Sequence, residues 1–230
     1  PPPPPPPPPP PFFFSRTRRQ TRSSLVSWAG DVYKRQEITL EDDLEAPYVD
    51  ITGTLDDERI EPVFKIKSIN HRNNPIFHAL IPAEAEHKAL MGLPRAPTIK
   101  TAVAAVTECH DVHMTEGGCG WLSAVVSITP DSPEDGRKAI EAALAGHRSM
   151  KMVTIVNKDI DVSDPVRVEW AMMTRWQPDR DTLIMTGQKG SSLDPSRNAD
   201  GTTGKIGYDA TISPDAVSYT HLTLPTNREV

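Results

Sequence analysis

The alternation of strand-like and helix-like segments between residues 121 and 185 constrains the fold of this 230-residue chain more than any other feature. Residues 121–128 and 151–156 are short apolar runs with several β-branched side chains, as in buried strands. Residues 132–146 begin with Ser, Pro and two acids, which is typical of a helix start, and Pro165 marks another helix start. Strands that alternate with helices predict an α/β layer with crossover connections.

The segments on either side of this core give weaker signals. Residues 62–69 alternate apolar and polar side chains, which predicts a strand with one buried face. Residues 83–91 and 98–106 have the composition of helices, and residues 182–185 are a short apolar run that predicts one more strand. Residues 187–204 are rich in Gly, Ser, Asp and Asn, and we expect a long surface loop there.

The two ends of the chain differ in composition from the rest. Residues 1–11 are all proline, a run without amide donors that forms an extended helix or coil. The arginines between residues 16 and 22 are compatible with a nucleic-acid-binding arm or a transit peptide. We prefer a third interpretation, because residues 31–36 and 217–230 look like translated sequencing-adapter read-through. We therefore expect residues 1–36 and 217–230 to be disordered and to pack against nothing.

Setting these ends aside makes the chain more acidic, since the formal charge of −6 becomes −11 for residues 37–216. An acidic body argues against a nucleic-acid partner. No apolar run approaches the roughly 20 residues of a membrane span, and no signal peptide is recognisable. The two cysteines, Cys109 and Cys119, do not make a disulfide framework, so we expect a cytoplasmic protein.

Two carboxylates lie five residues apart around a proline in the sequence EAPYVDITGT at residues 45–54. Pro47 fixes its own φ and restrains the preceding residue to an extended conformation, while Gly53 permits a tight turn. Carboxylates that are held rigidly in unlike surroundings can divide acid and base work. Glu45 and Asp50 are therefore candidate catalytic residues. The alternative is that they are two solvated acids beside the acidic run at residues 41–43.

Four potential zinc ligands, Cys109, His110, His113 and Cys119, occur close together. Their spacing is not a standard zinc pattern, because adjacent side chains such as Cys109 and His110 point apart on any regular element. The simpler interpretation is a strand end that leads into a glycine turn.

Other polar residues have simpler interpretations. Asp159 and Asp161 supply too few oxygens to bind a cation by themselves. We expect Arg175 and Arg180 to be structural salt-bridge partners. We expect His71 and His87 to be loop or cap residues and not general bases.

Several motifs, taken together and in order, resemble the UbiD-type prenylated-flavin decarboxylases. The acidic motif of that family is Glu-Gly-Pro-(aromatic)-Gly-(Asp/Glu)-x-Thr-Gly, in which Ala46 and Val49 here replace two glycines. The further matching segments are residues 86–87, 90–92, 117–119, 159–161, 168–171 and 205–211. The resemblance covers about residues 37–211, and the chain is similar to the carboxy-terminal portion of such an enzyme.

The resemblance implies an α/β fold and an incomplete fragment. Residues 37–95 would be the end of a split β-barrel that binds flavin and carries the acidic loop, and residues 96–216 would be an α/β carboxy-terminal domain. The implied activity is the removal of CO2 from an aromatic or α,β-unsaturated acid with prenylated FMN. The complete enzyme would be a homo-oligomer that also holds a divalent metal, usually manganese, and often potassium.

The resemblance also implies roles for individual residues. Asp50 would donate the proton, with Glu45 as its partner carboxylate. A lysine before an apolar strand must either extend to solvent or meet an anion, and the resemblance places Lys151 at the flavin phosphate, with Lys205 as the second choice. The family's arginine and metal ligands lie upstream, so this chain contains no assigned metal ligand, and we expect the fragment alone to be inactive. Two alternatives stay open, a non-catalytic oligomerisation module and a small zinc-binding interaction domain around residues 109–119.

Overall fold

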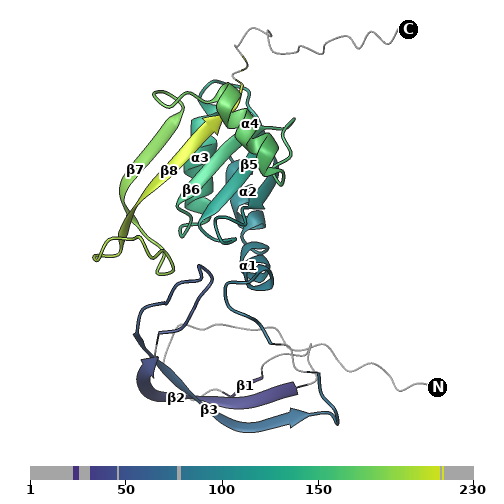
Figure 1. Cartoon of the computed structure of the whole chain (residues 1–230), viewed down its shortest axis with the longest axis vertical. Coiled ribbons are helices and arrows are strands. Elements are labelled where there is room, and N and C mark those ends of the chain that lie inside the picture. The colour runs from purple at the N-terminus through teal and green to yellow at the C-terminus, as the bar shows by residue number, and fades with distance from the viewer. Residues whose placement is uncertain (1–22, 26–31, 46, 77–78, 213, 215–230) are drawn as a thin grey trace, which may run out of the picture. The chain divides into compact units, whose positions relative to one another are not determined.

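A computed structural model describes residues 23–25, 32–45, 47–76, 79–212 and 214 of the chain (Figure 1). The chain divides into two compact units. The first, which we call the hairpin unit, comprises Pro1–Ala46 and Glu58–Ala79, and the second, the α/β unit, comprises Pro47–Asp57 and Leu80–Val230. The expected domain boundary between residues 95 and 96 stays a prediction.

The hairpin unit is a three-stranded antiparallel sheet in the order β1-β2-β3. Its strands are β1 (Ser23–Leu25), β2 (Val32–Glu45) and β3 (Arg59–His71). The strand predicted at residues 62–69 is therefore confirmed within a longer one. The expectation that residues 1–36 pack against nothing is wrong at residues 23–25 and 32–36, which pair with neighbouring strands. The remainder of that segment and residues 217–230 lie outside the described residues.

The apolar side chains of β3 are exposed, which corrects the prediction of one buried face. Phe64 is 50% exposed, and Ile66 and Ile69 are each 52% exposed. On β2, Leu40 and Leu44 are likewise exposed. The physical reason is that, among the described residues of this unit, no second layer covers an apolar face of the sheet.

The α/β unit contains a five-stranded sheet in the order β4-β5-β6-β8-β7, as the alternation of segments predicts. Its strands are β4 (Glu108–Met114), β5 (Ser123–Thr129), β6 (Met152–Asn157), β7 (Thr182–Lys189) and β8 (Thr202–Ala210). The three central strands, β5, β6 and β8, are parallel, and the edge strands β4 and β7 are antiparallel to their neighbours. Parallel neighbours require crossover connections, and helices supply them.

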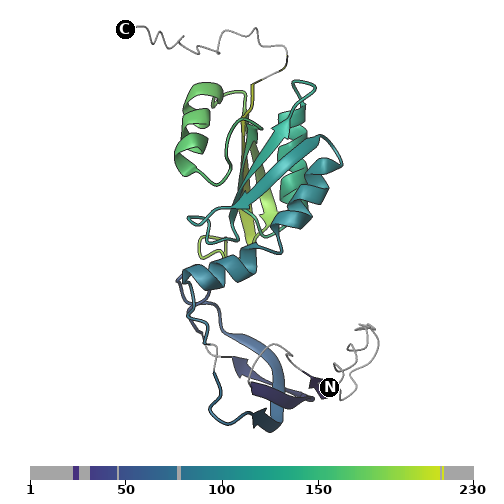
Figure 2. The ribbon, with the colours of Figure 1, turned by 90° about the vertical axis from the view of Figure 1, so that its right-hand side faces the viewer.

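Helices cover both faces of this sheet (Figure 2). They are α2 (Ala96–Ala104), α3 (Asp135–Gly146) and α4 (Pro165–Arg175), while α1 (Ala85–Gly92) lies beyond the end of the sheet (Figure 1). The α2 and α3 helices bury Ile99 and Ile140 against one face, while α4 buries Val168 against the other. Asp164 caps α4 by accepting the N–H groups of Val166 and Arg167 at 2.9 and 3.2 Å. Within the described residues no helix is long and apolar enough to cross a membrane.

A loop is present in the region predicted at residues 187–204, but both of its predicted bounds are wrong. β7 continues to Lys189 and β8 begins at Thr202, so residues 190–201 form the actual loop, which we call the β7–β8 loop. β8 lies inside the sheet, between β6 and β7, although its polar, glycine-containing sequence is not typical of a strand. Its Gly207 has a packing role, since a Cβ there would lie 2.1 Å from Cγ2 of Ile140 on α3.

Candidate active site

The acidic loop, residues 47–57, is a small closed structure of the α/β unit. An isolated antiparallel bridge joins Val49 to Leu55, and the Gly53 N–H donates to the Asp50 carbonyl at 2.8 Å. Gly53 has a φ of 75°, which confirms the tight turn expected there. The Ile51 side chain is completely buried and anchors the loop. The main chain on either side of Asp50 is thus constrained.

Asp50 lies beside His87 in this unit. Oδ1 of Asp50 is 4.0 Å from Nε2 of His87, and the two side chains are only 14% and 16% exposed. The Ala83 N–H donates to Nδ1 of His87 at 3.2 Å. A main-chain N–H can only donate, so Nδ1 is the acceptor, and the neutral ring carries its proton on Nε2, which faces Asp50. The contact with the Ala83 N–H fits the expectation that His87 is a cap or loop residue. The proximity of His87 to Asp50 is a second contact, which that expectation does not include.

A polar pocket of about 250 Å³ lies between the acidic loop and the β7–β8 loop. Asp50 and Asp57 line it from the acidic loop, and Asp194 and Arg197 line it from the β7–β8 loop. The Arg197 guanidinium donates to the Asp57 carboxylate. The Asp50 carboxylate therefore borders a polar cavity. Arg197 is the cationic group of its lining, and the other charged lining residues are aspartates.

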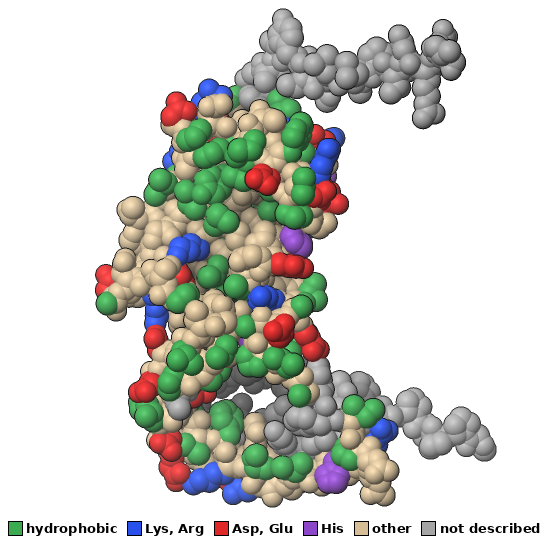
Figure 3. Space-filling model, viewed as in Figure 1, with side chains coloured by type: hydrophobic (Ala, Val, Ile, Leu, Met, Phe, Trp, Pro, Cys, Tyr) green, Lys and Arg blue, Asp and Glu red, His purple; other side chains and the backbone are tan. Residues whose placement is uncertain are grey.

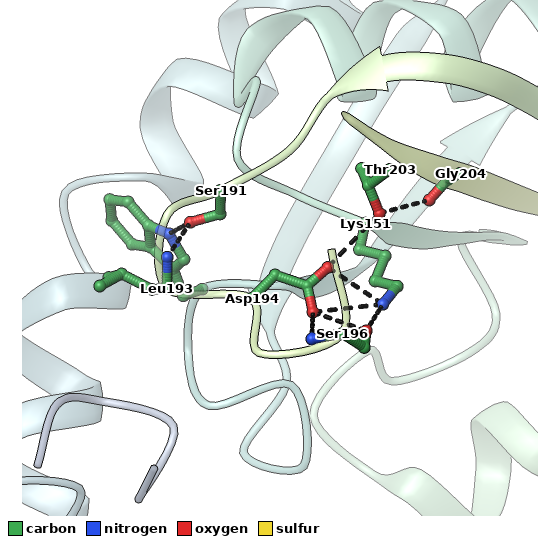
Figure 4. A network of polar contacts seen from close by, with 8 residues as sticks. Lys151, Ser191, Leu193, Asp194, Ser196, Thr203 and Gly204 are labelled. Carbon is green, nitrogen blue, oxygen red and sulfur yellow. Dashed lines mark hydrogen bonds and ion pairs between the residues drawn. The ribbon is translucent and has the colours of Figure 1, made fainter. Parts of the chain in front are cut away.

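Lys151 directly precedes the central strand β6 and forms an ion pair with the buried Asp194 (Figure 4). Its Nζ donates to Oδ2 of Asp194 at 3.0 Å and to the Ser196 hydroxyl. Burial alone would raise the pKa of Asp194, but the hydrogen bonds from Ser196 and Lys151 outweigh it, and the pKa lies below its usual range. The sequence gives no sign of this pair, because 43 residues separate the partners.

Lys151 also borders a second cavity, of about 990 Å³, in the α/β unit. Residues of β5, β6 and α4 line this cavity, together with the Gly117–Gly118 turn. The Lys151 side chain is 36% exposed, so its ammonium is not fully enclosed by Asp194 and Ser196. Its three N–H donors face three acceptors, the two carboxylate oxygens of Asp194 and the Ser196 hydroxyl, so an anion in the cavity would share the ammonium with them.

Lys205, the second choice for phosphate binding, lies on β8 and is only 6% exposed. Its Nζ donates to the main-chain carbonyl of Arg148. Burial, and secondarily the charge of Arg148, lowers the pKa of Lys205. These contacts favour a structural role for Lys205 over a ligand-binding one.

Glu45 belongs to a different unit from Asp50 and Lys151. It is the exposed last residue of β2, opposite Arg59, and it belongs to the hairpin unit, whereas Asp50 belongs to the α/β unit. The pairing of the two carboxylates stays a prediction.

The zinc alternative finds no support in the structure. Cys109 packs against the core, where burial raises its pKa, and Nε2 of His110 lies 2.7 Å from the Thr129 hydroxyl. Among the described residues, no group of three or more His, Cys, Asp or Glu side chains could hold a metal ion. The simpler interpretation, a strand that leads into a glycine turn, is confirmed by β4 and the turn that follows it.

The structural role predicted for Arg175 is confirmed. Its side chain is 7% exposed and forms a bidentate pair with Asp159 at 2.6 and 3.0 Å. The hydrogen bond from Arg175 lowers the pKa of Asp159. The pair ties the end of α4 to the loop that follows β6, so Asp159 is not free to bind a cation.

Two family models match most of the described chain. Residues 32–85 match the 3-octaprenyl-4-hydroxybenzoate carboxy-lyase Rift-related domain, and residues 88–210 match the C-terminal domain of the same carboxy-lyase. The chain is 50% identical over 167 residues to the anhydromevalonate phosphate decarboxylase of Methanosarcina mazei, covering 73% of this chain and 40% of the relative. It is 48% identical over 179 residues to the enzyme of that name from Methanocaldococcus jannaschii, covering 77% and 42%.

A gallate decarboxylase of Lactiplantibacillus plantarum is 31% identical over 139 residues, covering 58% of this chain and 28% of the relative. Among solved structures, the UbiD-class enzyme HmfF from Pelotomaculum thermopropionicum in complex with FMN superimposes with a TM-score of 0.79 at 31% identity, covering 85% of this chain and 44% of that one. The chain thus spans about 40% of the length of the anhydromevalonate phosphate decarboxylases it matches.

Proposed function

Because the chain belongs to the UbiD family of carboxy-lyases, we propose that the complete protein removes CO2 from a phosphorylated α,β-unsaturated acid. The observation that carries this proposal is the identity of 48–50% to anhydromevalonate phosphate decarboxylases. The name of their substrate describes a phosphorylated hydroxy acid that has lost water, which makes it an unsaturated acid. This is one of the two substrate classes that the sequence resemblance implies.

The proposed cofactor is prenylated FMN, which supplies the electron sink for CO2 loss when it is bound. A related structure in complex with this cofactor supports the proposal. Lys151 fits a phosphate ligand, because its partly exposed ammonium borders a large cavity and carries a positive charge there. The proposed manganese and potassium sites lie in upstream parts of the complete protein, as the family resemblance implies.

In this proposal Asp50 donates a proton to the carbon atom that has lost CO2. The constrained acidic loop holds its carboxyl group at the polar pocket, so that little reorganisation is needed at the moment of proton transfer. The Nε2–H group of His87 lies 4.0 Å from Oδ1 of Asp50, as a polar neighbour that can orient the carboxyl group. Glu45 would be a partner carboxylate that shares one proton with Asp50.

The chemistry is tested by measuring CO2 release from the purified complete protein reconstituted with prenylated FMN. We expect release from anhydromevalonate phosphate and much slower release from its dephosphorylated form and from gallate. The reason is that a site built for a charged phosphate leaves its polar groups unpaired with an analogue that lacks it, which costs about 10⁴–10⁵ in rate in well-studied cases. Faster turnover of gallate would overturn the substrate assignment and leave the reaction class in place.

The phosphate role of Lys151 has a separate test. In the complete protein, Lys151→Ala should weaken flavin retention by about tenfold or more, because a hydrogen bond to a charged group contributes about 1.5–3 kcal/mol. Flavin content after gel filtration and the flavin dissociation constant are the measurements. Lys158→Ala, which removes an exposed lysine beyond the other end of β6, serves as the matched control. Unchanged flavin content in Lys151→Ala would contradict the assignment.

We also propose that the complete protein is a cytoplasmic homo-oligomer and that this chain alone is inactive. One observation favours a subunit contact on α4, where Val166, Trp170 and Met173 are 72%, 47% and 67% exposed. Hydrophobic side chains gather on that part of the α/β unit (Figure 3). Exposed apolar groups of this kind often mark a protein contact. This surface also supports the alternative of a non-catalytic oligomerisation module, which the CO2 measurement excludes if the complete protein is active.

A further inference from the structure

The β7–β8 loop is ordered by its own hydrogen bonds and by a contact with the core. Gly190 N–H donates to the Gly201 carbonyl at 2.9 Å, which closes the base of the loop. The Trp121 indole donates to the Ser191 hydroxyl at 3.1 Å, and both residues are buried. The loop is therefore a folded wall of the polar pocket and not a loose connection.

The Asp194 carboxylate accepts most of the side-chain hydrogen bonds drawn in this loop (Figure 4). Its side chain is 3% exposed, and its carboxylate accepts hydrogen bonds from Lys151, from the main chain and hydroxyl of Ser196, and from the Thr203 hydroxyl. These donors come from three parts of the unit: the start of β6, the loop itself and β8. A buried carboxylate with this many donors holds the three parts together, and removing its charge leaves a partly buried lysine unpaired.

The loop then reaches the acidic loop through its next polar residues. The Arg197 N–H donates to the Asp194 carbonyl at 3.2 Å, which places Arg197 directly after the Asp194 turn. The Arg197 guanidinium binds the carboxylate of Asp57, at the end of the acidic loop. The acidic loop is closed next to this point, where the Asp56 N–H donates to the Tyr48 carbonyl at 2.9 Å.

A continuous chain of polar contacts therefore runs from β6 to the acidic loop. We propose that Asp194 is a positioning residue, which acts through Arg197 and Asp57 to set the conformation of the acidic loop and hence the position of the Asp50 carboxylate. In this role Asp194 does not touch the reacting atoms. The proposal rests on the role of Asp50 given under Proposed function.

The structural part of the proposal is tested by hydrogen–deuterium exchange on the complete protein. Asp194→Asn should accelerate amide exchange by about tenfold or more both in residues 190–201 and in residues 47–57, because loss of the buried charge opens the loop locally. Arg197→Gln removes a partly exposed group, so it preserves the fold and should accelerate exchange in residues 47–57 alone. Asp200→Asn is the matched control, since this exposed carboxylate of the same loop bonds to Thr202.

The functional part is tested by kinetics on the same variants. Asp194→Asn and Arg197→Gln should lower kcat by about tenfold, change KM little and alter the pH profile of kcat, whereas Asp200→Asn should leave all three unchanged. Exchange in residues 47–57 that stays at the wild-type rate in both test variants would overturn the proposal. The exchange result is independent of the role of Asp50, so a failure of the proton-donor assignment and a failure of the positioning proposal are distinguishable.

Discussion

In the complete protein, Asp50→Asn is expected to lower kcat by about 10²–10⁴-fold, which is the usual contribution of a positioned general acid. The amide keeps the size of the side chain and an oxygen that can accept the Ile51 N–H, but it has no acidic proton to give. Flavin content should be unchanged, because Asp50 lies on the acidic loop and not beside Lys151. Steady-state kinetics together with flavin absorbance measure both quantities.

Two variants make this result specific. Asp50→Glu keeps an acid at the position, and the family motif accepts either residue there, so it should retain more turnover than Asp50→Asn. Asp42→Asn, which changes an exposed acid of β2, should have no effect. Normal turnover in Asp50→Asn would mean that the acid lies elsewhere.

Glu45→Gln should also lower kcat in the complete protein, by about tenfold or more, and should change the shape of the pH profile. Two carboxylates that share a proton ionise as a coupled pair, so removing one of them replaces two macroscopic ionisations by one. The measurement is kcat as a function of pH for wild type and Glu45→Gln. Glu61→Gln, an exposed acid of β3, is the matched control. An unchanged profile would show that Glu45 does not act with Asp50.

The elements with strong local signals could be predicted from the sequence. The start of α4 is an example, because Asp164 and Pro165 form a capping pair whose effect is confined to one helical turn. β8 could not be found in the same way. Its two glycines and polar side chains weaken the strand signal, and its place between β6 and β7 depends on long-range pairing.

The site was predictable only in part, for a similar reason. The acidic motif and its turn at Gly53 are local features, and they marked Asp50 as a candidate. The contacts of Asp50 with His87 and of Lys151 with Asp194 join residues that are distant in sequence, and no spacing rule connects them. The exposed face of β3 was mispredicted because alternation reports which side chains need burial, and not whether a covering layer is present in this chain.

In the proposed reaction, Asp50 acts after CO2 has left, by protonating the remaining carbon. A single-turnover experiment on the complete protein, with the release of CO2 and the formation of the protonated product followed separately, tests this order directly. For Asp50→Asn we predict a burst of CO2 of up to one equivalent per active site at a near-normal rate, with product formation slowed by about 10²–10⁴-fold. Loss of CO2 release and product formation in parallel would contradict the claim, because it would place Asp50 at or before the bond cleavage.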